Sequence, residues 1–204
     1  STGEIVDSAA ISETASASIL ATGNVSGSVA YAAAGAASIA SELGDIDNSS
    51  ATAATTVNLT ALNGMISEST ATAGTNVDVE AVSAINSLLN AQTGYVELTV
   101  DIADNVNIYA GGEDLPGRGI IADIGLEIIG GEWITQHGDI QVEGELWRIS
   151  GTDFNAYGNV DITVMPTAPG IYGFVENVNI MSQWDTTLTV KTDIANSSVT
   201  SVLG

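Results

Sequence analysis

The chain contains no cysteine and very little positive charge. Its lysine and arginine residues number three, Arg118, Arg148 and Lys191, against 25 aspartate and glutamate residues, which gives a formal net charge of −22. An acidic content of this size is ordinary for a soluble protein. The imbalance therefore comes from the depletion of lysine and arginine, not from an excess of carboxylates.

This depletion excludes several classes of partner. Nucleic acids and anionic lipids are bound through clustered lysine and arginine side chains, which the chain does not have. An enzyme that eliminates across an acidic polysaccharide would also need basic residues to neutralise the substrate. The sequence thus predicts no nucleic-acid partner, and it disfavours acidic polysaccharide as a substrate.

Long hydrophobic runs are also missing. The longest uncharged stretch, residues 14–41, is interrupted throughout by Ser, Thr, Asn and Gly, so we expect no membrane insertion. The chain begins Ser1-Thr2-Gly3-Glu4, without methionine, as a processed secreted chain would, and a trimmed chain would begin in the same way. We therefore expect an extracellular protein at the cell surface.

Bulky residues are unevenly distributed along the chain. Residues 1–93 contain no basic residue, no proline and a single aromatic side chain, Tyr31, and are dominated by Ala, Ser, Thr and Gly. Residues 94–204 contain the other aromatic residues and can build a conventional core. We expect a repetitive region over residues 1–93, packed through thin layers, and a β region with an aromatic core over residues 94–204.

Period-2 alternation is the clearest local signal. From Ala9 to Ala33 the odd positions are almost all apolar or Gly, while most even positions as far as Ser28 are Ser, Thr or Asn. This pattern is typical of a half-buried strand, which at this length should be broken near Gly23 or Gly27. Residues 31–43 are Ala-rich and fit a helix or a strand equally well.

A repeat supports a solenoid. Residues 52–71 align without gaps on residues 72–91, and a short word of the form Asn/Thr-Val-Asn/Asp-aliphatic recurs around Val57, Val77, Val106, Val160 and Val178. Two of its four intervals match one solenoid turn, although any β protein rich in Asn, Thr and Val generates such words. The remaining segments read as strands and turns, with one possible short helix near residues 79–90. The predicted fold is all-β, either a β-solenoid or a β-sandwich.

Catalytic and metal-binding candidates are few. The single histidine, His137, lies near Asp139 but has no accompanying nucleophile motif, and a turn-exposed histidine is the commoner case. Calcium is the better metal hypothesis, with Asp45, Asp47, Asp101 and Asp104 as oxygen ligands, but no complete calcium-loop motif is present, and solvated acidic turns are the favoured interpretation of these residues. We predict a non-enzymatic protein with no cofactor other than this weak calcium candidate.

Carbohydrate offers a second set of candidates. Trp133, Trp147 and Trp184 could stack on sugars or fill the core of the second region. Sequons permit glycosylation at Asn24, Asn48, Asn58 and Asn196, in a number close to that expected by chance.

Assembly is the function that this composition favours. The extended segment of about residues 1–33 can pair with the sheet of a neighbouring copy through main-chain hydrogen bonds, or within its own sheet. The anchors predicted for a polymerisation interface are Ile5, Ile11, Ile19, Val25 and Val29. The composition is similar to that of microbial surface adhesins and fibre subunits.

We therefore expect a structural subunit of an extracellular cell-surface filament or adhesive fibre, a homopolymer held by strand pairing between subunits. A surface glycan or another cell-surface component is a further candidate partner. The alternatives are a secreted monomeric carbohydrate-binding module and, less favoured, a secreted glycoside-acting enzyme.

Overall fold

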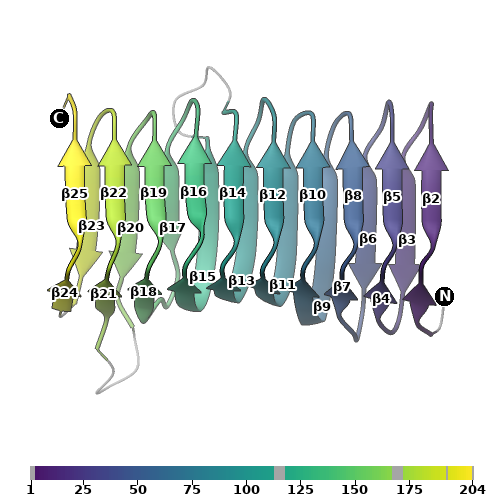
Figure 1. The fold of residues 1–204 in the computed structure, drawn as a ribbon, viewed down its shortest axis with the longest axis horizontal. Helices are drawn as coiled ribbons and strands as arrows, with labels where there is room; N and C mark the ends of the chain where they lie inside the picture. Colours follow the sequence, from purple (N-terminus) through teal and green to yellow (C-terminus); the bar gives the residue numbers. More distant parts are fainter. Residues whose placement is uncertain (1–2, 113–117, 167–171, 192, 204) are drawn as a thin grey trace.

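The computed structural model describes residues 3–112, 118–166, 172–191 and 193–203. Over these residues the chain is all-β without a helix, and it forms a parallel β-solenoid of about nine turns spanning residues 5–201. The turns stack side by side along one axis, with the two ends of the chain at opposite ends of the stack (Figure 1). Of the two predicted architectures, the solenoid is the correct one. The sequence Asp114-Leu115-Pro116-Gly117 predicts a turn, because Pro and Gly favour one, and these residues lie outside the described part of the chain.

Each turn has three faces, and every strand pairs in parallel with its equivalents in the adjoining turns. Face 1 is the ten-stranded sheet. It consists of β2 (Ala9–Ser12), β5 (Val29–Ala32), β8 (Ser50–Ala53), β10 (Thr70–Ala73), β12 (Leu88–Ala91), β14 (Asn107–Ala110), β16 (Glu132–Thr135), β19 (Asp153–Ala156), β22 (Asn179–Ser182) and β25 (Ser198–Ser201).

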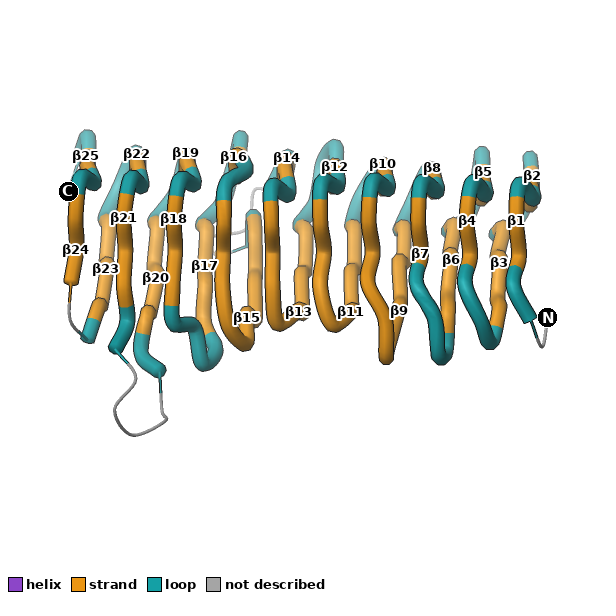
Figure 2. Tube along the Cα trace, turned by 60° about the horizontal axis from the view of Figure 1, so that its bottom comes forward, coloured by secondary structure: helices purple, strands orange, loops and turns teal. Residues whose placement is uncertain are grey.

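Faces 2 and 3 form one continuous 15-stranded sheet, because four long strands bend from one face to the other (Figure 2). These are β9 (Val57–Ser67), β11 (Val77–Ile85), β13 (Val96–Asp104) and β15 (Ile120–Ile129). Face 2 also contains β3 (Ala17–Ala21), β6 (Ala37–Ser41), β17 (Ile140–Glu143), β20 (Val160–Val164) and β23 (Thr186–Val190). Face 3 also contains β1 (Ile5–Val6), β4 (Val25–Ser26), β7 (Ile46–Asp47), β18 (Arg148–Ser150), β21 (Phe174–Glu176) and β24 (Asp193–Ala195).

The core changes in bulk along the axis. The first inward column of face 1 consists of alanines up to β10, then of Leu89 and Ile108, and then of Trp133 and Phe154. The rings of Trp133 and Phe154 meet edge to face with centroids 5.2 Å apart. Both sheets continue across residue 93, so the compositional change there is a change of core side chains within one continuous solenoid.

The long alternating segment is broken into short strands. Breaks occur around Gly23 and Gly27, as predicted, and also at residues 13–16. The inward positions change between odd and even across the breaks at residues 13–16 and at Gly27: Ala17 and Ile19 are buried in β3, whereas Ile11 in β2 and Tyr31 in β5 point outward. Residues 31–43, for which helix and strand were equally favoured, contribute to β5 and β6 and contain no helix.

The predicted short helix near residues 79–90 is wrong. This segment forms most of β11 and β12, which pair with β9 and β10 of the preceding turn. The helix-like spacing of Val82, Ile85 and Leu89 arises because the chain turns a corner between them, with a register shift between Ala81 and Ser83. Leu89 is buried, whereas Val82 is exposed, so these residues do not share one apolar face.

The predicted repeat corresponds to stacked turns. Thr52 pairs with Thr72 and Val57 pairs with Val77, at the offset that the sequence alignment gives. After Ala61 and Ala81 the offset shortens, and Met65 lies beside Ser83 instead of Ile85. The ungapped alignment is therefore in register over its first half only.

Candidate functional site

The first and last turns expose edges that the intervening turns cover. Among the described residues, β1, β2 and β3 pair only with the following turn, and β23, β24 and β25 only with the preceding one (Figure 1). Inward side chains that are fully buried in the middle of the stack are open here: Ile194 is 54% exposed and Val199 is 50% exposed. Unpaired strand edges of this kind are sites at which another strand can add.

The residues predicted as polymerisation anchors fall in the first two turns. Ile5 is half-buried at the open edge, and Ile19 is buried in the chain's own core beside it. Ile11 and Val29 point outward from face 1, and Val25 is fully buried in the second turn. The structure thus brings Ile5, Ile11 and Ile19 together at one end of the solenoid and places Val25 and Val29 one turn further in.

A corner between faces 3 and 1 recurs in every turn. At this corner the chain adopts a left-handed backbone conformation, with φ values of 44–52° for its non-glycine residues. These residues are Asp7, Asn48, Glu68, Asn86, Asn105, Asn177 and Asn196, with Gly27, Gly130 and Gly151 in the equivalent place in other turns. Asn and Gly tolerate this conformation best, which accounts for their repeated presence.

A serine follows the left-handed residue in most of these corners, and its hydroxyl holds adjoining turns together. The Ser8 amide donates to Ser28 Oγ at 3.2 Å, Ser28 to Ser49 at 3.2 Å, Ser49 to Ser69 at 3.2 Å and Ser69 to Ser87 at 3.3 Å. Each of these hydroxyls from Ser28 to Ser87 also donates to the carbonyl two residues before it. We call these five residues, Ser8, Ser28, Ser49, Ser69 and Ser87, the serine ladder.

Sequence reasoning missed the serine ladder, although a signal for it exists. The word aliphatic-x-(Asp/Asn/Glu/Gly)-Ser recurs at about 20-residue intervals, as in Ile5-Val6-Asp7-Ser8, Ile46-Asp47-Asn48-Ser49 and Ile66-Ser67-Glu68-Ser69. It returns at Ile194-Ala195-Asn196-Ser197, where the Val178 amide donates to Ser197 Oγ at 3.2 Å.

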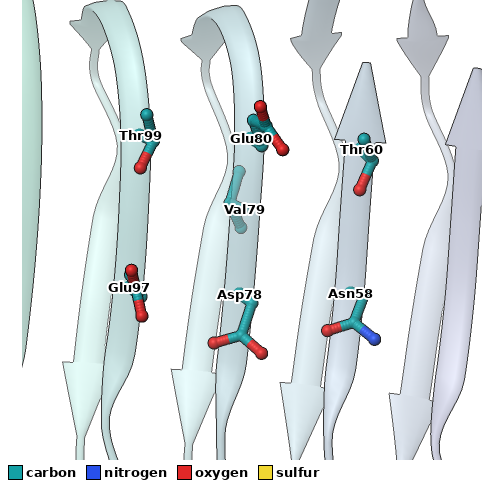
Figure 3. Close-up of a pocket in the computed structure, with 7 residues that line it drawn as sticks. All are labelled: Asn58, Thr60, Asp78, Val79, Glu80, Glu97 and Thr99. Carbon is teal, nitrogen blue, oxygen red and sulfur yellow. The ribbon is translucent and has the colours of Figure 1, made fainter. Parts of the chain in front are cut away.

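An open groove runs over the outward side of face 2. It is lined by seven residues of three neighbouring turns: Asn58, Thr60, Asp78, Val79, Glu80, Glu97 and Thr99 (Figure 3). Asp78 lies in register between Asn58 and Glu97. Burial and, secondarily, the charge of Glu97 raise the pKa of the Asp78 carboxyl above its ordinary value. Its Oδ1 atom is buried without a hydrogen-bond partner.

The four calcium candidates form two pairs that lie in different turns. Asp45 and Asp47 flank the buried Ile46, and they accept hydrogen bonds from the Met65 amide at 2.8 Å and the Ser67 hydroxyl at 2.6 Å. Asp101 and Asp104 lie in β13, three turns further along. Within the described part of the chain, no three acidic or histidine side chains are grouped as a metal ion would require.

The sequon asparagines occupy three kinds of position. Asn48 and Asn196 are exposed at the left-handed corner. Asn24 is also exposed, and its Oδ1 accepts the Asp45 amide of the next turn at 3.0 Å. Asn58 is half-buried on face 2, at the edge of the groove.

The single histidine and the three tryptophans differ in their exposure. His137 is exposed and contacts the Tyr157 ring edge to face, and Asp139 accepts the Asn159 amide at 2.6 Å. Trp133 is fully buried, with its indole N–H donating to the Val106 carbonyl at 3.2 Å, so it cannot stack on a sugar. Trp147 is half-buried and Trp184 is 54% exposed.

Arg148 links three turns on face 3. It donates to Glu176 at 2.9 Å and lies 4.0 Å from Glu127. The hydrogen bond from Arg148 holds the pKa of the Glu176 carboxyl below its ordinary value, with Ser150 contributing in the same direction.

Comparisons of this chain with protein-family models, with curated proteins and with solved structures found no match. Among the residues that the structure describes, no helix has the length and hydropathy needed to span a membrane.

Proposed function

We propose that the protein is a structural subunit of an extracellular cell-surface filament, assembled from copies of itself by β-strand pairing between subunits. The observation that carries this proposal is the pair of open parallel edges at the first and last described turns. A stack of parallel turns presents the same pairing surface wherever it is interrupted, so one copy can continue the sheets of the next.

The charge distribution supports contact through the ends. Outward acidic residues such as Asp78, Glu80 and Glu97 lie on face 2. With a net charge of −22, lateral association along face 2 would oppose like charges, whereas end contact buries backbone groups and apolar side chains.

The test is electron microscopy of the purified chain over a range of concentrations, with two matched variants. Val199→Lys places a charge on an inward position of the last turn, and we expect it to abolish filaments because the charge would be buried on pairing. Thr200→Lys adds the same charge on the outward side of the same strand and should leave filaments intact.

A wild-type protein that stays monomeric at all concentrations would overturn the proposal, as would a Val199→Lys variant that polymerises normally. Immunogold labelling of intact cells of the source tests the location, since labelled fibres at the surface are expected.

A further inference from the structure

The first and last turns have the same local design. Residues 5–12 read Ile-Val-Asp-Ser-Ala-Ala-Ile-Ser and residues 194–201 read Ile-Ala-Asn-Ser-Ser-Val-Thr-Ser. In both, a face 3 strand leads through a left-handed residue, Asp7 or Asn196, and a serine into a face 1 strand. The spacing between the inward aliphatic residues is also identical, from Ile5 to Ala10 and from Ile194 to Val199.

From this match we infer that copies stack head to tail and in register, with residues 194–201 of one copy lying beside residues 5–12 of the next. This inference rests on the proposed function and specifies its contact: the last turn meets the first turn as two neighbouring turns within one chain do.

The backbone donors and acceptors of the two edges complement each other. In each turn the amide of the left-handed residue donates to the carbonyl that precedes its equivalent in the following turn, from Asp7 to Ser26 (2.9 Å) through to Asn177 to Ala195 (3.1 Å). The next bond of this series runs from the Asn196 amide to the Val6 carbonyl of the following copy.

A second series runs in the opposite direction. In most turns the first residue of the face 1 strand donates to the serine-position carbonyl of the preceding turn, as Val29 does to Ser8 (2.8 Å) and Ser198 to Val178 (2.9 Å). Its continuation joins the Ala9 amide of the following copy to the Ser197 carbonyl.

The serine ladder also continues across this contact. Ser197 occupies the position in the last turn that the ladder serines occupy in the first turns, and its hydroxyl accepts the Val178 amide. The Ser197 amide is equivalent to the Ser8 amide, and the Ser8 amide donates to the serine hydroxyl of the following turn. In the stack the Ser197 amide donates to Ser8 Oγ of the next copy, whose hydroxyl is already oriented by its bond to the Val6 carbonyl at 3.1 Å.

The stack covers the open core at both ends. Ile194 lies on Ile5 of the next copy and Val199 on Ala10, which buries two side chains that are half exposed in the single chain. Burying such apolar side chains is the main favourable term in association.

The polar side chains define the electrostatics of the contact. Asn196 lies beside Asp7, to which its neutral amide group can donate, as Asn105 donates to Asn86 at 2.9 Å at the same corner. Asp193 lies beside Glu4, which opposes two like charges at the rim.

Cysteine cross-linking tests the register directly, because the natural chain has no cysteine. Ile11 and Thr200 are exposed outward positions of β2 and β25, and the stack makes them neighbours. Neighbouring strands lie about 4.8 Å apart, within the Cα range that a disulfide bridges. Ser198, two residues from Thr200, is displaced to about 8 Å and serves as the matched control.

The experiment mixes Ile11→Cys protein with Thr200→Cys protein, oxidises them with diamide under filament-forming conditions, and resolves the products on a non-reducing gel. We expect a heterodimer yield at least about tenfold above that from Ile11→Cys with Ser198→Cys, since the second pair exceeds bridging distance. Circular dichroism checks that each variant is folded.

Equal heterodimer yields from the two pairs, or a dominant Ile11→Cys homodimer, would overturn the head-to-tail register. If filaments are still seen by microscopy in that case, the proposed function stands. Absence of both cross-links and filaments would overturn the two together.

Discussion

Asp78 stands between Asn58 and Glu97 in the in-register column of face 2, with one carboxylate oxygen buried and unpaired. Its raised pKa means that the folded protein binds this proton more tightly than the unfolded chain does. The contribution of Asp78 to stability therefore falls as the pH rises from its ordinary pKa of 3.8 through the raised value, and stays low at neutral pH.

Asp78→Asn should consequently stabilise the protein at pH 7 by about 1 kcal/mol, because it removes the repulsion from Glu97 and supplies an amide in place of the unpaired oxygen. Thermal melts at pH 7 and pH 3 check this, and the gain should shrink at pH 3, where Asp78 is protonated. Asp161→Asn, in the same column beside Gln141 and Thr187, is the control and should change little. A stabilisation independent of pH would contradict this account.

Several glycines pack directly against an Asn or Asp side chain of the turn before. Gly158 is such a case: a Cβ there would meet Asp139 Oδ1 and lie 2.6 Å from the Gly138 carbonyl oxygen. Asp139 accepts the Asn159 amide through that same oxygen. The arrangement recurs with Gly44 over Asn24 and Gly94 over Asn76.

Gly158→Ala should therefore destabilise the protein by roughly 1–3 kcal/mol through overpacking. Gly23→Ala is the matched control, since its nearest atom would lie at 3.4 Å, an ordinary contact. Denaturant unfolding of the two variants measures the difference in stability. Equal unfolding midpoints would show that the Asp139 side chain moves aside without loss of stability.

Sequence reasoning could not find these residue-level contacts. Gly158 and Asp139 are separated by a full turn, and their contact depends on a register that varies from turn to turn. Asp78 likewise directly precedes the helix predicted near residues 79–90, and it is a strand residue because β9 and β13 pair on either side of it.

Among the elements, most strands outside residues 31–43 and 79–90 were predictable, but the side of each strand that faces the core was not. Alternation identified residues 9–33 as β, and the 52–71 repeat gave the true pairing of Val57 with Val77. The corners change the parity of the alternation, so that Ala10 and Ala30, not Ile11 and Tyr31, face the core.

The serine ladder is the strongest test at the scale of elements. Ser69 is 1% exposed, accepts the Ser49 amide and donates to the Ser67 carbonyl at 2.8 Å. Ser69→Ala leaves the Ser49 amide without its partner, whereas the Ser67 carbonyl keeps its bond from the Asn48 amide. We expect a loss of about 1–3 kcal/mol in unfolding free energy.

Ser18→Ala, an exposed outward position of β3, serves as the control for Ser69→Ala and should be nearly neutral. Hydrogen exchange gives a second readout, because the Ser49 amide should lose protection first. Unchanged protection at that amide would contradict the role assigned to the ladder.

For the whole molecule, charge sets the conditions of assembly. Each copy carries −22, and the proposed contact opposes Asp193 with Glu4. Salt shortens the range of such repulsion to about 10 Å at 0.1 M, while strand pairing and apolar burial are not weakened by it.

Filament formation should therefore increase several-fold in extent between low salt and about 0.5 M NaCl, where the screening length is only a few ångströms. Light scattering measures this, with sucrose at equal osmolality as the control for exclusion effects. Dissociation of filaments by salt would mean that ion pairs hold the subunits, contrary to the contact described.

The direction of the hydrogen bonds has a mechanical consequence. The hydrogen bonds between turns run along the solenoid axis. A load applied along that axis is therefore shared by all the bonds that join one turn to the next. The turns follow one another along the axis, so the load passes through them in series. Extension would then proceed turn by turn, each released turn of about 20 residues adding roughly 6–7 nm of contour. A fibre built this way would yield in steps under tension and absorb work at each one.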